Sequence, residues 1–143
     1  MDHENPIIVV AAVIRQEGRI LICRRRKDQD HGGKWEFPGG KLEPGEQPHE
    51  ALQRELQEEL RIAPRVGEEI KRHLYSYPGR GPIQLIFFDV AEFFGEPDYT
   101  HFHETAWATP EELPRYDFLD GDIEFVKELA GGLVPSPGPG GPA

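Results

Sequence analysis

Apolar residues gather along the chain in short runs separated by polar turns. The pattern predicts, in sequence order, strands, a helix, more strands and terminal helices. The first run, Ile7 to Ile14, is aliphatic and β-branched, and a second run, Arg19 to Cys23, follows the turn at residues 16–18. Short apolar runs bounded by turn residues are typical of buried strands. We expect these two runs to pair as a hairpin, with a polar loop over residues 24–33 after them.

The segment from Pro48 to Leu60 has helical spacing. At about 100° per residue, Leu52, Leu56 and Leu60 share one face, and polar side chains fill most of the others. Proline suits the first turn of a helix, because its missing N–H does no harm there. We predict a helix over this segment that packs through its leucines.

The second half of the chain returns to strand-like composition and ends in helices. Residues 69–77 and 82–94 are rich in aromatic and aliphatic side chains, and Glu104 to Ala108 is expected to add a short last strand. Thr109 to Glu112 matches a capping box that opens a short helix. A last helix is expected from about residues 120–122 to Ala130. Its inward positions are expected to be Ile123, Val126 and Leu129.

The length of 143 residues suits one domain with its own core. We expect that domain to cover residues 1–131, and the proline- and glycine-rich residues 132–143 to form a disordered tail. Cys23 is the only cysteine, which excludes an intrachain disulfide and suits a reducing cytoplasm. Its apolar neighbours favour a buried, inert thiol.

The formal net charge of −10 argues against binding to a nucleic acid polymer, because such binding depends on Lys and Arg at the phosphates. No apolar run has the length that a bilayer requires, and the N-terminal residues lack the pattern of an export signal. We therefore expect no membrane anchor and a cytoplasmic location. A small anionic substrate is compatible with this charge if basic residues such as those at 24–27 meet it.

Three glutamates of the predicted helix supply the most informative chemistry. Glu55, Glu58 and Glu59 fall within one sector about 100° wide, behind a glycine turn at Gly39 and Gly40. Like charges on one face repel unless a counter-ion lies among them, and hard divalent cations prefer oxygen ligands. The pattern favours a site for a divalent metal and phosphate, and an acidic, solvated helix face is the plainer alternative.

The spacing of Gly40, Glu46 and the run Arg54-Glu55-Leu56-Gln57-Glu58-Glu59 resembles the Nudix box of nucleoside diphosphate-linked hydrolases. The preceding run from Lys34 to Gly40 is similar to the MutT-type branch, and the resemblance extends from about residue 7 to about residue 129. It implies an α/β (α+β) fold, the Nudix α/β/α sandwich with a mixed β-sheet. It also implies hydrolysis of a nucleoside triphosphate to the monophosphate and pyrophosphate with Mg2+, or alternatively Mn2+.

The resemblance implies metal ligation by Glu55, Glu58, Glu59 and the main-chain carbonyl of Gly39. Glu55 is also the first choice for the general base, because a carboxylate beside a divalent cation can accept a proton from the attacking water. Glu46 and Arg54 are expected to form an ion pair that braces the box loop, which begins at Gly40, against the catalytic helix.

Two positions depart from the family pattern. Family members often take another carboxylate from the loop before a tryptophan, here Trp107, and at that spacing this chain has His101. The fourth ligand or alternative base stays open among His101, His103 and Glu104, and a solvated loop side chain is the plainer alternative for each histidine. Arg61 stands where the box has glycine, so either Arg61 takes a left-handed backbone or the helix ends differently.

Substrate contacts are expected from five residues. Arg25 matches the family's phosphate-binding arginine, and Glu36 is also expected to bind the substrate. The resemblance implies a base pocket with Phe37 and Tyr77, although such aromatic residues taken alone are more often core or rim residues. Asp122 takes the place of an asparagine with which MutT contacts oxidised guanine. An ionised carboxylate accepts hydrogen bonds from guanine-type N1 and N2 or from the cytosine amine. The alternative role of Asp122 is a helix N-cap.

These expectations lead to a MutT-type pyrophosphohydrolase that removes oxidised nucleotides such as 8-oxo-dGTP and acts as a monomer, with a dimer left open. A pyrophosphohydrolase for CTP, dCTP or modified dCTP is the alternative within the enzyme class. The non-enzyme alternative is a Nudix-fold module that binds a nucleotide or a partner without turnover. The presence of all three glutamates, Glu55, Glu58 and Glu59, argues against that module.

Overall fold

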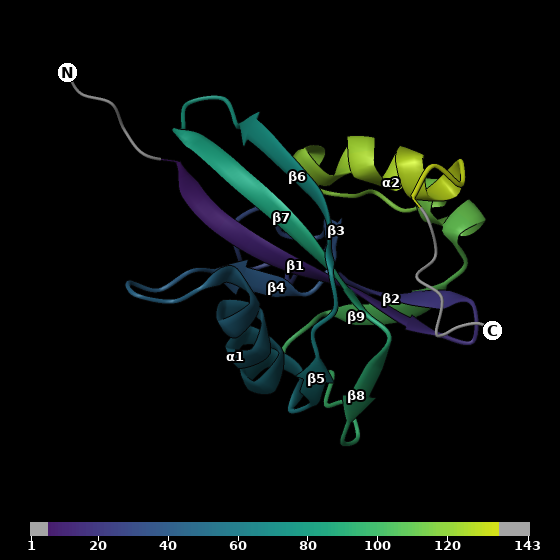
Figure 1. Ribbon diagram of the computed structural model, residues 1–143. Coiled ribbons are helices and arrows are strands. Elements are labelled where there is room, and N and C mark those ends of the chain that lie inside the picture. The colour runs from purple at the N-terminus through teal and green to yellow at the C-terminus, as the bar shows by residue number, and fades with distance from the viewer. Residues whose placement is uncertain (1–5, 135–143) are drawn as a thin grey trace.

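A mixed β-sheet crosses the centre of the molecule, and helices lie on its two faces (Figure 1). The computed structural model describes residues 6–134, so residues 135–143 of the predicted tail lie outside the described part. The strands are β1 (Ile7–Gln16), β2 (Arg19–Arg24), β3 (Trp35–Glu36), β4 (Gly39–Lys41), β5 (Ala63–Arg65), β6 (Glu69–Ser76), β7 (Pro82–Val90), β8 (Glu92–Phe94) and β9 (Glu104–Ala108). The helices are α1 (Pro48–Leu60) and α2 (Ile123–Ala130), with 3-10 helices at Pro110–Arg115 and Asp120–Asp122.

The main sheet has the strand order β3-β2-β1-β7-β6, with β4 paired to β1 and β9 paired to β2. Strands β1 and β7 run parallel over eight residue pairs, and the other pairings of this sheet are antiparallel. The predicted hairpin is present, because Arg15 of β1 pairs with Ile20 of β2. The expected mixed sheet is therefore confirmed.

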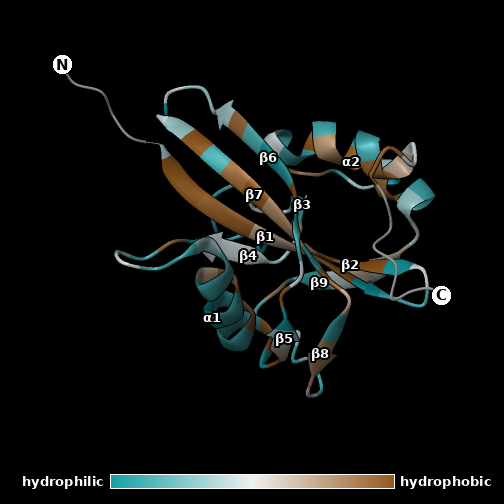
Figure 2. Ribbon diagram, viewed as in Figure 1, coloured by the Kyte–Doolittle hydropathy of each residue, from teal (hydrophilic) through white to brown (hydrophobic). Residues whose placement is uncertain are grey.

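Each face of the sheet buries its own apolar cluster. On one face Leu52, Leu56 and Leu60 of α1 pack with Val10 and other residues of the sheet, as the leucine spacing predicted. On the opposite face α2 packs through Phe125 and its neighbours. Strand β1 is apolar along most of its length (Figure 2), because both of its faces are covered. The predicted α/β/α arrangement is thus observed, and it fixes α1 against the strands.

Several predicted boundaries were wrong. Residues 82–94 do not form one strand: β7 ends at Val90, and β8 turns away after Ala91 to pair with β5 in a separate two-stranded sheet. Strands β3, β4 and β5 were not predicted, because two or three residues are too few for an alternating pattern. These short strands matter, because β3 and β4 hold the segment between the polar loop and the box.

The two predicted C-terminal helices differ from expectation in their details. The capping box at Thr109 is present, since its N–H donates to the Glu112 carboxylate at 2.9 Å, but it opens a 3-10 helix. Ile123 was predicted to face the core, yet 39% of its surface is exposed and Phe125 is buried instead. The reason is that α2 follows a 3-10 turn and begins only at Ile123, which lies over the groove beside β6.

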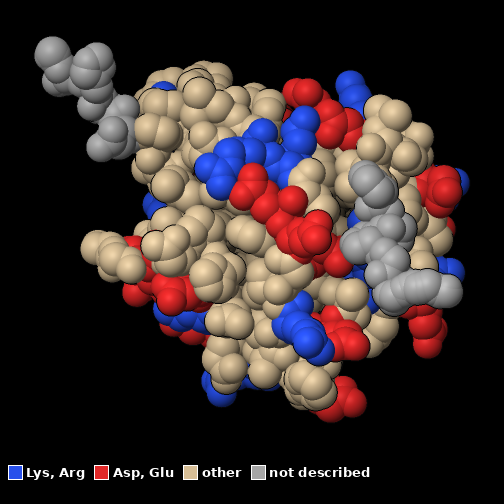
Figure 3. Space-filling model, viewed as in Figure 1, with Lys and Arg blue, Asp and Glu red and all other residues tan. Residues whose placement is uncertain are grey.

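Acidic and basic side chains lie next to one another on the face shown in Figure 3. The ion pairs of the molecule include Lys71–Glu128 and Arg72–Glu69, with N–O distances of 3.0 and 2.7 Å. Within residues 6–134, no helix combines the length and apolar character required to cross a membrane.

Candidate active site

The turn before α1 depends on two glycines that allow close backbone contacts. Strand β4 pairs with β1, and a Cβ on Gly39 would overlap the carbonyl oxygen of Val10. A Cβ on Gly40 would overlap the carboxylate of Glu55, which lies directly against it. The glycine pair therefore lets the carboxylates of α1 approach the main chain of β4.

Arg54 joins the box loop to α1 as predicted. Its Nε and Nη2 donate to the two oxygens of Glu46 at 2.7 and 3.0 Å, and Nη2 also donates to the Lys41 carbonyl at 3.0 Å. Its Nη1 lies 3.1 Å from Glu55 and 3.2 Å from Glu58. The hydrogen bonds to Glu46 contribute most to raising the pKa of Arg54 above its ordinary value. The guanidinium thus offsets repulsion among three carboxylates.

Burial makes two carboxyl groups of α1 harder to ionise than ordinary glutamates. Burial, then repulsion from Glu36 and Glu55, raises the pKa of Glu59 to about 9. Burial is also the largest cause of the raised pKa of Glu55, with Arg54 acting in the opposite direction. A carboxyl group that is hard to ionise without a counter-ion is suited to a bound cation.

The donor set fits a hard divalent cation in chemistry but not yet in arrangement. Glu55, Glu58, Glu59 and the Gly39 carbonyl supply only oxygen, which Mg2+ prefers. In the part of the chain that the structure describes, however, no three His, Cys, Asp or Glu side chains are gathered closely enough to hold an ion. Arg54 draws Glu55 and Glu58 to itself, while Glu59 accepts a 3.3 Å hydrogen bond from the Gly39 N–H.

A cavity of about 280 Å³ opens beside this turn. Nine of the predicted site residues line it, namely Arg25, Glu36, Phe37, Gly39, Gly40, Glu59, Tyr77, His101 and Asp122. Those outside its lining are Glu46, Arg54, Glu55, Glu58, His103 and Glu104. The cavity thus brings the glycine turn and one box glutamate together with the predicted base-pocket residues.

Arg25 and Glu36 form an ion pair in the wall of the cavity. The Arg25 Nη1 lies 2.9 Å from the Glu36 carboxylate, and its Nε donates to the Asp30 carbonyl at 2.8 Å. Burial raises the pKa of Glu36, and the charge and hydrogen bond of Arg25 oppose that rise. Glu36 therefore holds the predicted phosphate-binding arginine in place.

The two predicted aromatic residues differ in their freedom to contact a base. Phe37 is 3% exposed and packs on Phe118 and Phe125, with ring centroids 5.3 and 5.8 Å away. It is mainly a core residue whose edge reaches the cavity. Tyr77 is partly exposed, and its hydroxyl accepts a hydrogen bond from the Gly121 N–H at 3.0 Å. Tyr77 is therefore the ring better placed to contact a ligand.

Asp122 occupies the N-cap position of α2, but its side chain makes no capping hydrogen bond. The residue is 6% exposed and lines the cavity. Burial, followed by repulsion from Glu36, raises its pKa well above the ordinary value. A buried carboxyl group that does not cap its helix and faces a cavity favours the ligand-binding role over the structural one.

The structure separates the three candidates for a fourth ligand or base. His101 lines the main cavity and also a smaller surface hollow beside Glu58 and Arg61. His103 is exposed, and Glu104 pairs with Arg24 at 3.2 Å. His101 is therefore the candidate that lies beside the box glutamates.

Arg61 ends α1 in the left-handed conformation, with φ 58° and ψ 33°, so this chain places arginine where the box glycine is expected. Its N–H donates to the Gln57 carbonyl at 3.0 Å, which closes the last turn. The helix thus ends at the expected residue despite the departure in sequence.

The sequence did not point to several residues of the cavity. Their sequence signals are weak, because none of them is a defining position of a motif with diagnostic spacing. They are a lysine after the glycine pair, an aromatic residue beside His101, and polar side chains in two surface loops. By number, the residues are Gln29, His31, Lys41, Arg80 and Phe102. They come from strand β4 and three different loops, so only the fold brings them together.

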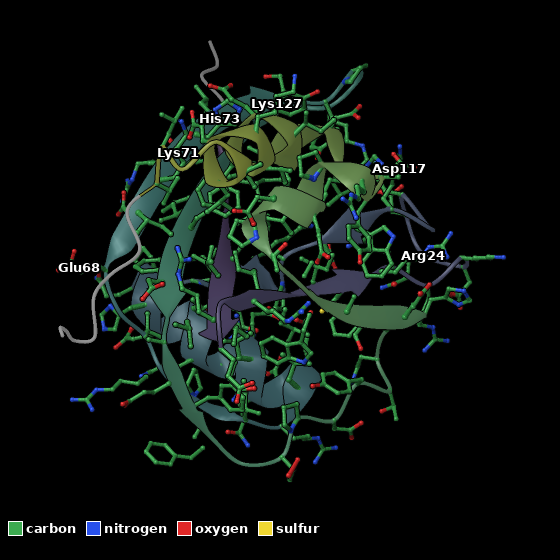
Figure 4. The ribbon with its side chains drawn as sticks, turned by 90° about the vertical axis from the view of Figure 1, so that its right-hand side faces the viewer. Arg24, Glu68, Lys71, His73, Asp117 and Lys127 are labelled. Carbon is green, nitrogen blue, oxygen red and sulfur yellow. The ribbon has the colours of Figure 1, made fainter. Side chains whose placement is uncertain are left out.

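A second, open groove lies between β6 and α2, away from the predicted site. Its lining includes His73, Tyr75 and Lys127. Figure 4 shows His73 and Lys127 near Lys71 at one side of the molecule, far from Arg24. This groove contains none of the predicted site residues.

Comparison with known proteins matches this arrangement to one family. A family model described as the NUDIX domain covers residues 4–129. The chain is 40% identical to a CTP pyrophosphohydrolase from Escherichia coli K12 over 121 residues, covering 85% of this chain and 89% of that protein. It is 41% identical to an 8-oxo-dGTP diphosphatase from the same strain over 122 residues, covering 85% and 94%.

A solved structure gives the same result for the fold. The solution structure of the E. coli ORF135 protein superposes with a TM-score of 0.79 at 37% identity, covering 92% of this chain and 93% of that one. The family match spans most of the sequence, and the box residues occupy one glycine turn and one helix beside the cavity. On these grounds the chain belongs to the Nudix hydrolases.

Proposed function

We propose that this enzyme hydrolyses nucleoside triphosphates to nucleoside monophosphate and pyrophosphate. The observation that carries the proposal is the shared cavity. The glycine turn and Glu59 line it together with Asp122, which is buried and does not cap its helix. A polyphosphate needs the acidic, metal-binding region, and a nucleobase needs a buried polar group that orients it. One molecule with both parts, a nucleoside triphosphate, matches both regions.

The phosphates and the attacking water would be handled by residues near the glycine turn. Arg25 and Lys41 line the same cavity and would neutralise phosphate oxygens. Glu55 is the proposed proton acceptor for the water, because burial already makes its carboxyl group more basic than an ordinary glutamate. His101 is the second candidate for this proton transfer.

Nudix hydrolases generally use divalent metals. We propose Mg2+ for this enzyme, with Mn2+ as an alternative, and Glu55, Glu58, Glu59 and the Gly39 carbonyl as its ligands. The chemistry supplied by the bound ion is neutralisation of phosphate charge. Arg54 would then keep its bonds to Glu46 while Glu55 and Glu58 turn away from it.

The proposed substrate is an oxidised guanine nucleotide such as 8-oxo-dGTP, which is the substrate named for one relative at 41% identity. Asp122 would meet the N1 and N2 hydrogens of the base when ionised. When protonated, it would both donate and accept. A cytidine triphosphate is the second candidate, because a relative at 40% identity is a CTP pyrophosphohydrolase and Asp122 also suits the cytosine amine.

The cellular setting follows from charge and composition. The net charge of −10 disfavours a nucleic acid polymer as partner, so the substrate would be a free nucleotide. We also propose a cytoplasmic location, because the single cysteine is a buried free thiol that suits a reducing compartment. The enzyme is further proposed to act as a monomer.

The test is product release from 8-oxo-dGTP, dGTP, dCTP, CTP and ADP-ribose with Mg2+, measured separately as pyrophosphate and orthophosphate. Glu58→Gln is the matched control, because it keeps the shape of a proposed ligand and removes its charge. Pyrophosphate release that fails in Glu58→Gln supports the proposal, and the ratio of kcat/KM values gives the preferred base.

Two results would overturn the proposal. Release of orthophosphate alone would mean that a different bond is cleaved. Nucleotide binding without any product, and with affinity retained in Glu58→Gln, would favour the binding module.

A further inference from the structure

Two rings from different loops meet at the cavity. His31 lies in the loop between β2 and β3, and Tyr77 follows β6. Their ring centroids are 5.1 Å apart with an interplanar angle of 40°, and both residues line the cavity. The proposed function assigns no role to His31.

Tyr77 connects this ring pair to the buried end of the cavity. Its hydroxyl accepts the Gly121 N–H at 3.0 Å, directly beside Asp122, while its ring contacts His31. The ring is further held by Tyr75, whose centroid is 4.7 Å away at 73°. Asp122, Tyr77 and His31 therefore follow one another from the buried end of the cavity outward.

The loop presents His31 in a defined conformation. His31 has a φ of 56°, in the left-handed region that is sterically unfavourable for a non-glycine residue. Its carbonyl accepts the Lys34 N–H at 3.3 Å, and a Cβ on the adjacent Gly32 would lie 2.6 Å from the Lys27 carbonyl oxygen. The loop is thus folded tightly on itself, which accounts for the strained backbone at His31.

An ion pair ties this loop to the β6–β7 turn. The Arg80 Nη2 lies 2.8 Å from the Asp30 carboxylate, next to His31, and Arg80 also lines the cavity. The Asp30 carbonyl accepts the Arg25 Nε at 2.8 Å. The position of His31 is therefore coupled both to the opposite loop and to the proposed phosphate-binding arginine.

We propose that His31 is a specificity-determining residue that favours purine over pyrimidine triphosphates, with Arg80 and Asp30 as its positioning residues. The inference rests on the proposed function. A guanine-type base that meets Asp122 through its N1 and N2 edge directs its second, five-membered ring away from Asp122, along Tyr77 and toward His31. A pyrimidine in the same orientation has no second ring to reach His31.

The test compares purine and pyrimidine ligands in matched variants. His31→Asn removes the ring but keeps a residue type that tolerates the left-handed backbone. His31→Phe restores a flat ring. His49→Asn, an exposed histidine on the outer part of α1, is the control for the same substitution elsewhere. For each protein we would measure kcat/KM for dGTP and dCTP, and the Kd of dGMP and dCMP by calorimetry.

Because one stacking contact is lost, His31→Asn is expected to lower kcat/KM for dGTP roughly tenfold and to raise the Kd of dGMP by a similar factor. The same quantities for dCTP and dCMP should change less than about twofold. His31→Phe should recover most of the purine preference, and His49→Asn should match the wild type. Equal losses for both bases, or none for the purines, would overturn the proposal.

The positioning role of the ion pair has its own readout. Asp30→Asn and Arg80→Met should each reduce the purine preference in the wild-type background and have no further effect in His31→Asn, because they act through His31. Additive losses would contradict that role.

Failure of the proposed function remains distinguishable from failure of this inference. If the wild type releases no pyrophosphate from any triphosphate, the proposed reaction is wrong, yet the monophosphate affinities still test His31. If the wild type is active and the two bases respond alike in His31→Asn, only the inference about His31 fails.

Discussion

At the residue scale, the most informative side chain is Asp122. It occupies the N-cap position of α2, where aspartate commonly caps a helix, and the sequence alone left capping and base recognition equally open. In the structure the Asp122 side chain makes no capping hydrogen bond, and its carboxyl group is buried beside the cavity. The distinction depends on the 3-10 turn before α2, which no sequence pattern indicated.

The raised pKa of Asp122 predicts a pH-dependent stability difference. In the unfolded chain the group ionises near pH 4, while in the folded state burial keeps it protonated to higher pH. Its contribution is therefore fully present below about pH 4 and is lost as pH rises toward the folded-state pKa. We expect Asp122→Asn to match the wild type near pH 4 and to exceed it by on the order of 1–2 kcal/mol at pH 7.

Denaturant unfolding at pH 4, 5.5 and 7 measures this difference. Asp120→Asn is the control, because Asp120 is an exposed neighbour in the same 3-10 turn. A stability difference between Asp122→Asn and the wild type that stays constant with pH would show that the carboxyl group does not titrate as its burial implies.

At the element scale, α1 was predicted with the bounds Pro48–Leu60 that the structure has. Its leucine spacing, its N-terminal proline and the box motif all pointed to the same segment. Strands β3, β4 and β5 could not be predicted, because each has only two or three residues and is held by partners far along the chain. Two of the three inward positions predicted for α2, Val126 and Leu129, are buried, but the predicted start at residues 120–122 did not reveal that Ile123 lies outside the core.

The C-terminus of α1 allows a test of the departure at Arg61. Glycine adopts the left-handed conformation without the steric cost that arginine bears, so Arg61→Gly should stabilise the protein by roughly 0.5–1 kcal/mol. Arg61→Ala retains a Cβ and should give no comparable gain. Thermal unfolding of both variants, with kcat/KM measured beside it, checks this. An equal gain in both variants would mean that the arginine charge, not the backbone, is responsible.

The junction of the box loop with α1 depends on Arg54. Arg54→Met removes the bonds to Glu46 and leaves Glu55 and Glu58 facing each other without a cation, so the proposed ligands should lose their positions. Residues that orient metal ligands typically account for 10–100-fold in activity, and we expect a loss of roughly that size. Arg65→Met is the control, because its pair with Glu92 is exposed and lies 3.4 Å apart.

The comparison of these two variants needs both activity and stability. Arg54→Met should lower the midpoint of thermal unfolding more than Arg65→Met does, and only Arg54→Met should lose activity. Full activity in Arg54→Met would show that the carboxylates keep their positions without the guanidinium.

At the scale of the whole molecule, the fold places acidic side chains of α1 beside the Gly39–Gly40 turn. The sheet fixes β4 against β1, α1 packs on the same strands, and this arrangement presses Glu55 and Glu59 against the Gly39–Gly40 backbone. Burial, and after it repulsion from neighbouring carboxylates, raises the pKa values of Glu55 and Glu59, so their ionised forms are disfavoured. A cation that binds only the folded state would relieve the repulsion and stabilise the entire domain.

This coupling predicts a metal-dependent melting temperature. At a Mg2+ concentration 100 times its Kd, binding to the folded state alone adds about 2.7 kcal/mol, which corresponds to a shift of several degrees for a domain of this size. Scanning calorimetry with and without Mg2+, at ionic strength matched with NaCl, measures the shift. The double variant Glu58→Gln, Glu59→Gln should melt at the same temperature with and without Mg2+. If the melting temperature of the wild type also fails to shift, the acidic face of α1 is a solvated helix surface rather than a metal site. An equal shift in both proteins would place the bound ion away from these two glutamates.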